Sequence, residues 1–205
     1  MTLVLFHTAE SNVAVFDAAA QAAGFGRSMR HVVRADLLRA AEDAGGLTDE
    51  IRQRSADAMR RELTGALVCT CSTIGPGADD LSAEGMDVVR VDRALAEAAV
   101  KGASRVAVLF AVETTEGPTR DLFERVAEQM NPRASIEMVH VAGAWEKFRA
   151  GDADGYFQAI ADRAAALDSG FDAIALAQAS MAPAARLCQR KVLTSPGAVF
   201  ARMKG

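Results

Sequence analysis

This chain has few of the residues that mark several common kinds of functional site. Aromatic residues make up 5% of its 205 residues, and it has only three histidines and three cysteines. No two histidines stand at the spacing of metal ligands, and Cys69 with Cys71 alone makes a poor metal site. We therefore expect a core of aliphatic side chains and no bound metal.

The sequence also lacks long apolar runs and a surplus of one charge. No run approaches the length of a membrane span, and residues 1–12 lack the basic region and the apolar stretch of a signal peptide. A net charge of −4, with both signs interspersed, gives no reason to expect nucleic acid as a partner. Three cysteines in an unsignalled chain predict reduced thiols and a cytoplasmic location.

What the sequence does contain is a regular alternation of short apolar runs with helical stretches. We predict strands at residues 2–7, 29–35, 65–71, 88–91, 104–111, 136–141, 172–177 and 191–194. Helices are predicted at 13–24, from 48 to the strand at 65, after 75, at 91–103, 118–130 and 145–167, after the loop at 178–183, and from about 196. We expect the long helix at 145–167 to break near Gly151, with a new N-cap at Asp152 or Asp154. This alternation predicts the α/β class, with parallel strands and helices on both faces.

The predicted strands and helices follow the same order in two successive parts of the chain, which indicates an internal repeat. Cys71 and Gln178 lie 107 residues apart, as do Thr8 and Thr115. The same offset lays the strand at Met29 over the strand at Ile136, and the long helix before Gly65 over the helix before Asp172. We infer two similar βαβα halves, the second beginning near residue 101. The predicted division is residues 1–100 plus 186–205 for the first half and residues 101–185 for the second.

The stretch VCTCSTIGP, residues 68–76, carries the strongest chemical signal. An apolar strand there delivers Cys71 to its carboxyl end, where a helix begins. Unpaired amides and the positive end of a helix dipole favour a thiolate, which would make Cys71 reactive. The alternative is an ordinary buried, inert cysteine. Cys69 is expected to lie deeper, as core filler, and Cys188 to be structural in the middle of a helix.

The motif Cys71-Ser72-Thr73 resembles the first cysteine motif of the aspartate/glutamate/hydantoin racemase superfamily, which also contains arylmalonate decarboxylase and maleate isomerase. Residues 89–119 resemble the linking helix, central strand and Thr-rich loop of that superfamily. The second cysteine motif should fall on residues 177–181, which read AQASM. The second cysteine is absent: the ungapped register places Gln178 there, and a shift of one residue places Ala179.

The resemblance implies two flavodoxin-like halves related by a pseudo-twofold axis, with the active-site cleft between them. It implies an enzyme that needs no cofactor, acts on a small carboxylate or amino acid, and forms a homodimer or a higher homo-oligomer. Relatives racemise with two thiols, one on each face of the α-carbon. A lone thiol at Cys71, facing a hydrogen-bonding Gln178, is more similar to the decarboxylases, in which one cysteine protonates a carbanion. Lyase or isomerase chemistry is therefore expected in place of two-base racemisation.

Four polar loops follow predicted strands and would line that cleft, because ligands of open α/β sheets bind beyond the carboxyl ends of the strands. Hydroxyl side chains in these loops and helix-start amides suit a small carboxylate. Our candidate ligand-binding residues are Thr8, Ser11, Ser72, Thr73, Thr114, Thr115 and Ser180.

Several of these residues have plainer interpretations. Gln178 also fits a satisfied polar residue at a loop start, and Thr114 with Thr115 also fits a helix cap. His7 is either a loop histidine or a proton donor, and Asp92 reads as a solvated charge that stands at a strand end. For the whole chain, the alternative to an enzyme is a non-catalytic protein that binds a small carboxylate and has lost the second acid. A thiol-redox role is a third interpretation, which the C-x-C spacing of Cys69 and Cys71 does not favour.

Overall fold

The chain folds around two parallel four-stranded sheets. A computed structural model describes residues 2–204. The first sheet has the order β2 (Met29–Val33), β1 (Leu3–His7), β3 (Ala66–Cys69) and β4 (Val88–Arg90). The second repeats this order with β6 (Ser135–His140), β5 (Arg105–Phe110), β7 (Ala173–Leu176) and β8 (Leu193–Thr194). Every strand pair in both sheets is parallel. The predicted α/β class with two similar halves is confirmed.

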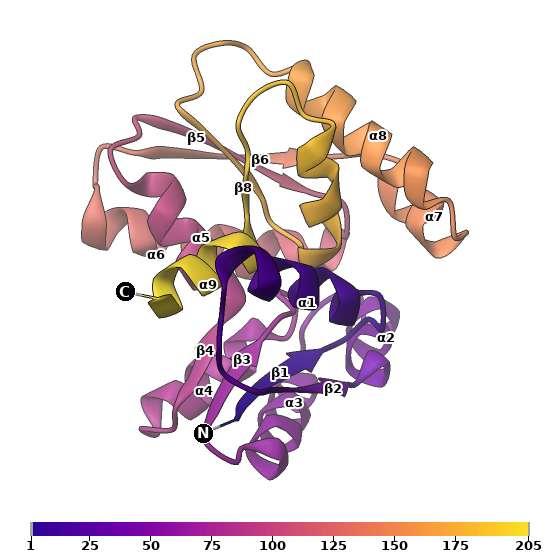
Figure 1. Cartoon of the computed structure of the whole chain (residues 1–205), viewed down its shortest axis with the longest axis vertical. Coiled ribbons are helices and arrows are strands. Elements are labelled where there is room, and N and C mark those ends of the chain that lie inside the picture. The colour runs from indigo at the N-terminus through magenta and orange to yellow at the C-terminus, as the bar shows by residue number, and fades with distance from the viewer. Residues whose placement is uncertain (1, 205) are drawn as a thin grey trace.

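Helices connect the strands and cover both faces of the sheets (Figure 1). Beside the first sheet lie α1 (Asn12–Ala23), α2 (Ala35–Asp43), α3 (Asp49–Glu62) and α4 (Gly75–Ala83), and α5 (Val91–Val100) leads to the second. The later helices are α6 (Glu116–Met130), α7 (Ala144–Arg149), α8 (Ala153–Ala165) and α9 (Ser195–Lys204), with 3-10 turns η1 (Glu113–Thr115) and η2 (Ala179–Arg186). No helix in residues 2–204 is long and apolar enough to cross a membrane.

Local sequence signals account for several of these helix boundaries. Thr48 Oγ1 accepts a hydrogen bond of 3.3 Å from the Ile51 amide and so caps α3. The predicted break at Gly151 is present, with φ of 79°. Of the two predicted caps after it, Asp152 is the one used, because its Oδ1 accepts from the Gly155 amide at 2.9 Å.

Two predictions of local structure were wrong. The strand at 29–35 ends at Val33, and α2 follows it with Leu37 and Ala41 buried, a helix that we did not predict. Cys188 is not in a helix, because the chain after β7 forms the 3-10 turn η2, which ends at Arg186. Pro183 lies inside η2 and has no N–H to donate, which opposes a regular α-helix there.

At the carboxyl ends of the strands, the offset of 107 residues holds for the pairs β2/β6 and β3/β7 and fails for the other two pairs. β3 and β7 obey it, because Cys69 and Leu176 end the two strands. β1 and β5 do not, because β1 ends at His7 and β5 at Phe110. The two halves have connections of unequal length, so Thr8 does not correspond structurally to Thr115.

The predicted division into residues 1–100 plus 186–205 and residues 101–185 needs a correction at β8. β8 pairs with β7 and so completes the second sheet, although we assigned it to the first half. α9 then returns to pack on α1 and α5. Figure 1 shows α9 beside α1, between the two sheets. Below we call the two sheets, each with its flanking loops, the first and second halves.

Candidate active site

A cavity of about 40 Å³ lies at the carboxyl ends of the central strands, between the two halves. Residues from the loops that follow β1, β3, β5 and β7 meet at this cavity. These are the four strand ends at which we predicted polar loops to line a cleft. The lining residues are Thr8, Ala9, Asn12, Leu38, Thr70, Cys71, Ser72, Thr73, Val112, Thr115, Trp145, Phe148, Gln178, Ala179 and Ser180. Cys71 carries the one thiol in this set, and no carboxylate, imidazole or ammonium group is among these described lining residues.

Cys71 is half-buried two residues beyond the end of β3, just before α4. Burial raises the pKa of its thiol above the ordinary value. The Thr8 hydroxyl, the Ile74 and Thr73 amides and the Thr73 hydroxyl bond the sulfur and offset part of that rise. We expected the strand-end position to favour a thiolate. The amides act in the expected direction, but burial outweighs them, so the net shift of the thiol pKa is upward and opposite to the one we expected.

The other two cysteines lie outside the cavity lining. Cys69 is buried in the core of the first half, where its Sγ–H donates to the Cys71 carbonyl at 3.5 Å. Its pKa is raised strongly, first by burial and then by Cys71. Cys188 is half-buried beside the core of the second half, and its Sγ–H donates to the Ala184 carbonyl at 3.4 Å.

Gln178 takes the place in the second half that Cys71 takes in the first. Each is the second residue after its strand, β7 or β3. Gln178 Oε1 accepts hydrogen bonds from the backbone N–H groups of Ala111 at 2.6 Å and Val112 at 3.0 Å. These two donors fix which amide atom is the oxygen. The Nε2–H₂ group is therefore the part of Gln178 that is free to donate to a ligand.

The predicted hydroxyl residues are mostly brought together, but most of them already bond other groups of the protein. Thr73 Oγ1 lies 3.3 Å from Thr115 Oγ1 and 3.4 Å from Thr114 Oγ1, which links the two halves across the cleft. Ser72 Oγ–H donates to the Ala177 carbonyl at 3.5 Å. Ser180 Oγ lies 2.9 Å from the buried hydroxyl of Tyr156.

Ser11 does not belong to this site, because it is exposed before α1 and does not line the cavity. Thr114 is also absent from the lining and reaches the site only through Thr73. Seven lining residues were not among our candidates: Ala9, Asn12, Leu38, Thr70, Val112, Trp145 and Phe148. Asn12 Oδ1 is buried and accepts no hydrogen bond within the described chain, which marks this side chain as a candidate ligand contact.

His7 lies behind the cavity wall and not in it. His7 Nδ1 lies 2.8 Å from Thr70 Oγ1, whose hydroxyl also lies 3.1 Å from the Phe6 carbonyl. His7 Nε2 lies 2.9 Å from His31 Nδ1. Burial, followed by the neighbouring His31, lowers the pKa of His7 to about 4. A neutral, buried histidine of this kind does not face a ligand, so a direct proton-donor role is not supported.

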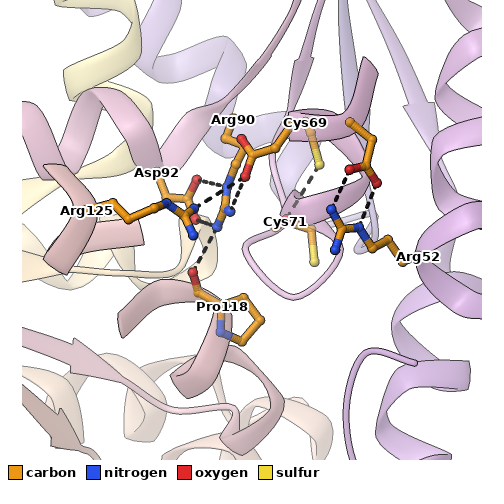
Figure 2. Close-up of polar contacts among 9 residues, drawn as sticks. Arg52, Cys69, Cys71, Arg90, Asp92, Pro118 and Arg125 are labelled. Atoms are coloured by element: carbon orange, nitrogen blue, oxygen red, sulfur yellow. Dashed lines mark hydrogen bonds and ion pairs between the residues drawn. The ribbon is translucent and has the colours of Figure 1, made fainter. Parts of the chain in front are cut away.

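Arg90 and Asp92 support the loop that carries Cys71. Figure 2 shows the Arg90 guanidinium next to Asp92 on one side of the Cys71 loop, with Arg52 on the other side. Arg90 also donates to Asp79 Oδ2 at 2.9 Å and to the Pro118 carbonyl of the second half at 3.2 Å. Burial opposes the charge on Arg90, but Asp92 and Asp79 more than offset it and raise its pKa. We expected Asp92 to be solvated, which was wrong: its side chain is 1% exposed.

Gly75, the first residue of α4, is required by this arrangement. A Cβ at position 75 would lie 2.5 Å from Arg90 Nε, closer than real contacts allow. No group of three or more His, Cys, Asp or Glu side chains within the described part of the chain is arranged to hold a metal ion.

By sequence, the chain matches no protein-family model and no curated protein. By structure, it superimposes on solved racemases over almost its whole length. An aspartate racemase from Picrophilus torridus matches with a TM-score of 0.71 at 12% identity, covering 98% of this chain and 92% of that one. The chain has the racemase fold.

Other racemases of this fold match comparably. A glutamate racemase from Bacillus anthracis gives a TM-score of 0.70 at 11% identity, covering 99% of this chain and 80% of that one. An allantoin racemase from Klebsiella pneumoniae gives a TM-score of 0.62 at 17% identity, covering 100% of this chain and 86% of that one. The resemblance read from the Cys71 motif therefore extends to the whole architecture of the racemase fold.

Proposed function

We propose that this chain is a cofactor-independent enzyme that transfers a proton to or from the α-carbon of a small carboxylic or amino acid. Cys71 is the acid that supplies the proton. One observation carries the proposal: Cys71 and Gln178 occupy equivalent positions in the two halves, and both line the same cavity. The activities of the glutamate, aspartate and allantoin racemases that share the fold support this reaction class.

A single thiol limits what the site can do. Inversion at carbon needs one group to remove the proton from one face and a second group to return it to the other. Among the described lining residues Cys71 is the one titratable group, and Gln178 has no proton that it can exchange in this way. We therefore favour chemistry that delivers a proton to one face, a decarboxylation or an isomerisation.

In the decarboxylation of a substituted malonate, the bond between the α-carbon and one carboxylate breaks and carbon dioxide leaves. The electron pair of that bond stays on the α-carbon and the remaining carboxylate. The Cys71 Sγ–H bond then gives its proton to that carbon, and water returns a proton to the thiolate. Gln178 Nε2–H₂ is placed to donate to the negative oxygens that develop, an electrostatic contribution of the oxyanion-hole kind.

The protonation state of Cys71 agrees with this role. Because burial raises its thiol pKa, Cys71 holds its proton near neutral pH, as a proton donor must. A two-base racemase needs one of its two thiols deprotonated before turnover begins.

The test is product formation in deuterated water from amino acids and 2-substituted malonic acids, with Cys71→Ser compared with Cys69→Ser. We expect loss of activity in Cys71→Ser by on the order of 10²- to 10⁴-fold. Cys69→Ser, which changes the core and not the cavity, should keep it. Equal loss in both variants, or loss in neither, would exclude Cys71. Exchange with inversion of configuration would contradict the one-thiol mechanism.

The second candidate is a non-catalytic protein that binds a small carboxylate in the same cavity. It is favoured by the hydroxyls of Ser72, Thr73 and Ser180, which are already bonded to groups of the protein and so leave few groups for chemistry. Saturable binding of the same acids, with no deuterium incorporated into any of them, would support it over the enzyme.

A further inference from the structure

The cavity has an outer wall that the strand-end loops do not supply. Leu38 of α2 belongs to the first half, and Trp145 and Phe148 of α7 belong to the second. α2 otherwise packs on α3, and α7 on α8. The wall is therefore assembled from one helix of each half, and Figure 1 shows α2 and α7 on the same side of the molecule.

A second hollow, of about 470 Å³, lies on the other side of this wall. It is lined by Ala35, Leu38, Arg39, Glu42, Asp43, Trp145 and Arg149. Leu38 and Trp145 line both the cavity and this outer hollow. These two side chains therefore form the partition between them, and a molecule that passes from one space to the other must displace them. The hollow carries charges of both signs, so the apolar partition and not a net charge controls passage.

One specific bond holds the partition in place. Trp145 Nε1–H donates to Glu42 Oε1 at 3.0 Å and so joins α7 of the second half to α2 of the first. On its other side, Trp145 stacks on Phe148, with ring centroids 4.8 Å apart and planes 11° apart. A hydrogen bond to a charged carboxylate is stronger than one between neutral groups.

The helix that carries Trp145 is bounded on both sides by a glycine. α7 has six residues and lies between Gly143, with φ of 72°, and Gly151, with φ of 79°. Both glycines adopt the left-handed region, where a side chain would be strained, and such positions absorb the backbone changes of lid motions.

We propose that Leu38 and Trp145 form a gate between the outer hollow and the Cys71 cavity, and that the Trp145–Glu42 hydrogen bond holds this gate closed. A small carboxylate enters from the hollow when the bond breaks and α7 turns away from α2. Glu42 acts through Trp145 and is a positioning residue. The role of this gate in catalysis rests on the proposed function of Cys71. The opening of the gate can nevertheless be measured without any turnover of substrate.

Two readouts follow the gate directly. Trp145 is the only tryptophan of the chain, so quenching of its fluorescence by acrylamide reports its own exposure. Alkylation of Cys71 by iodoacetamide reports access to the cavity, with the modified peptides separated by mass spectrometry. Cys188, outside the cavity, is the internal reference for general loosening of the fold.

Glu42→Ala removes the acceptor, and Glu42→Gln keeps an acceptor oxygen at the same place. Asp43→Ala is the matched control, because Asp43 lines the same hollow without a bond to Trp145. In Glu42→Ala we expect Cys71 alkylation and Trp145 quenching to rise, the former on the order of tenfold, from the loss of one charge-assisted hydrogen bond. Glu42→Gln, which keeps a weaker, neutral hydrogen bond, should fall between the wild type and Glu42→Ala, and Asp43→Ala should stay close to the wild type. Trp145→Ala should raise Cys71 alkylation at least as much as Glu42→Ala.

Cys71 alkylation that is the same in Glu42→Ala as in Asp43→Ala would overturn the gate. So would a parallel rise at Cys188, because it would indicate a loosened fold. The two proposals fail separately. If alkylation responds as expected but no acid reacts, the gate stands and the enzyme proposal fails; if Cys71→Ser abolishes turnover while alkylation does not respond, the reverse holds.

Discussion

Arg90 and Asp92, two residues apart in the sequence, form an ion pair in which both side chains are 1% exposed. Arg90 Nε and Nη2 donate to the two carboxylate oxygens at 2.9 Å and 2.8 Å. Removing one partner of such a buried pair leaves the other charge without compensation. Because Arg90 also contacts Gly75 and the Pro118 carbonyl, this pair supports both the Cys71 loop and the junction of the halves.

The first prediction concerns this pair. Arg90→Met should lower the free energy of unfolding by about 3–5 kcal/mol, because Asp92 is left buried and unpaired. The matched control is Arg93→Met, whose exposed pair with Glu97 is worth less than about 1 kcal/mol. Urea unfolding measures both. A loss of less than about 1 kcal/mol in Arg90→Met would show that the pair is not needed for stability.

The second prediction is a pH dependence of stability caused by His7. Its pKa is about 4 in the folded chain, against 6.5 when unfolded, so between these values the unfolded chain binds more protons. Stability from this group is therefore lost as the pH falls from about 6.5 to 4, by about 3 kcal/mol in all. His7→Gln, which does not titrate, should flatten the unfolding free energy over this range. Denaturant unfolding at several pH values measures it, and a slope identical to the wild type would refute it.

The third prediction is the titration of Cys71. Because its thiol pKa is raised, the rate of alkylation by iodoacetamide should keep increasing with pH beyond the point at which an ordinary thiol has titrated. Thr8→Val removes one of the hydroxyls that favour the thiolate and should move the titration higher still. A titration point below that of an ordinary thiol would mean that the amides of the Cys71 loop dominate over burial.

The fourth prediction restores the missing thiol. Gln178→Cys should place a second acid opposite Cys71 and allow deuterium exchange with inversion, because both faces of the α-carbon then meet a thiol. The variant also leaves the Ala111 and Val112 amides without their acceptor, at a cost of about 1–3 kcal/mol that thermal unfolding should register. Ala179→Cys is the control. Inversion in Ala179→Cys but not in Gln178→Cys would mean that the shifted register is the right one.

Much of this site could be predicted from local sequence, and the reason is periodicity. Apolar runs such as residues 104–111 predict a buried strand wherever they occur, and the break at Gly151 with a cap at Asp152 depends on residues that are neighbours in sequence. The same logic placed Cys71 and Gln178 at the ends of equivalent strands. It failed at α2, whose short amphipathic run follows directly on β2.

The sequence by itself determined the α/β alternation, the two similar halves and the position of Cys71 at the end of a strand, because each depends on the order of short local patterns. Only the tertiary structure decided what surrounds that cysteine. Glu42 and Trp145 are 103 residues apart, and Gln178 reaches amides 66 and 67 residues away. No local pattern encodes such contacts, because they arise when distant segments pack: within the second half for Gln178, and between the two halves for Glu42 and Trp145. Burial in that packing also reversed the expected protonation of Cys71, because the cost of desolvating a thiolate depends on everything that encloses it.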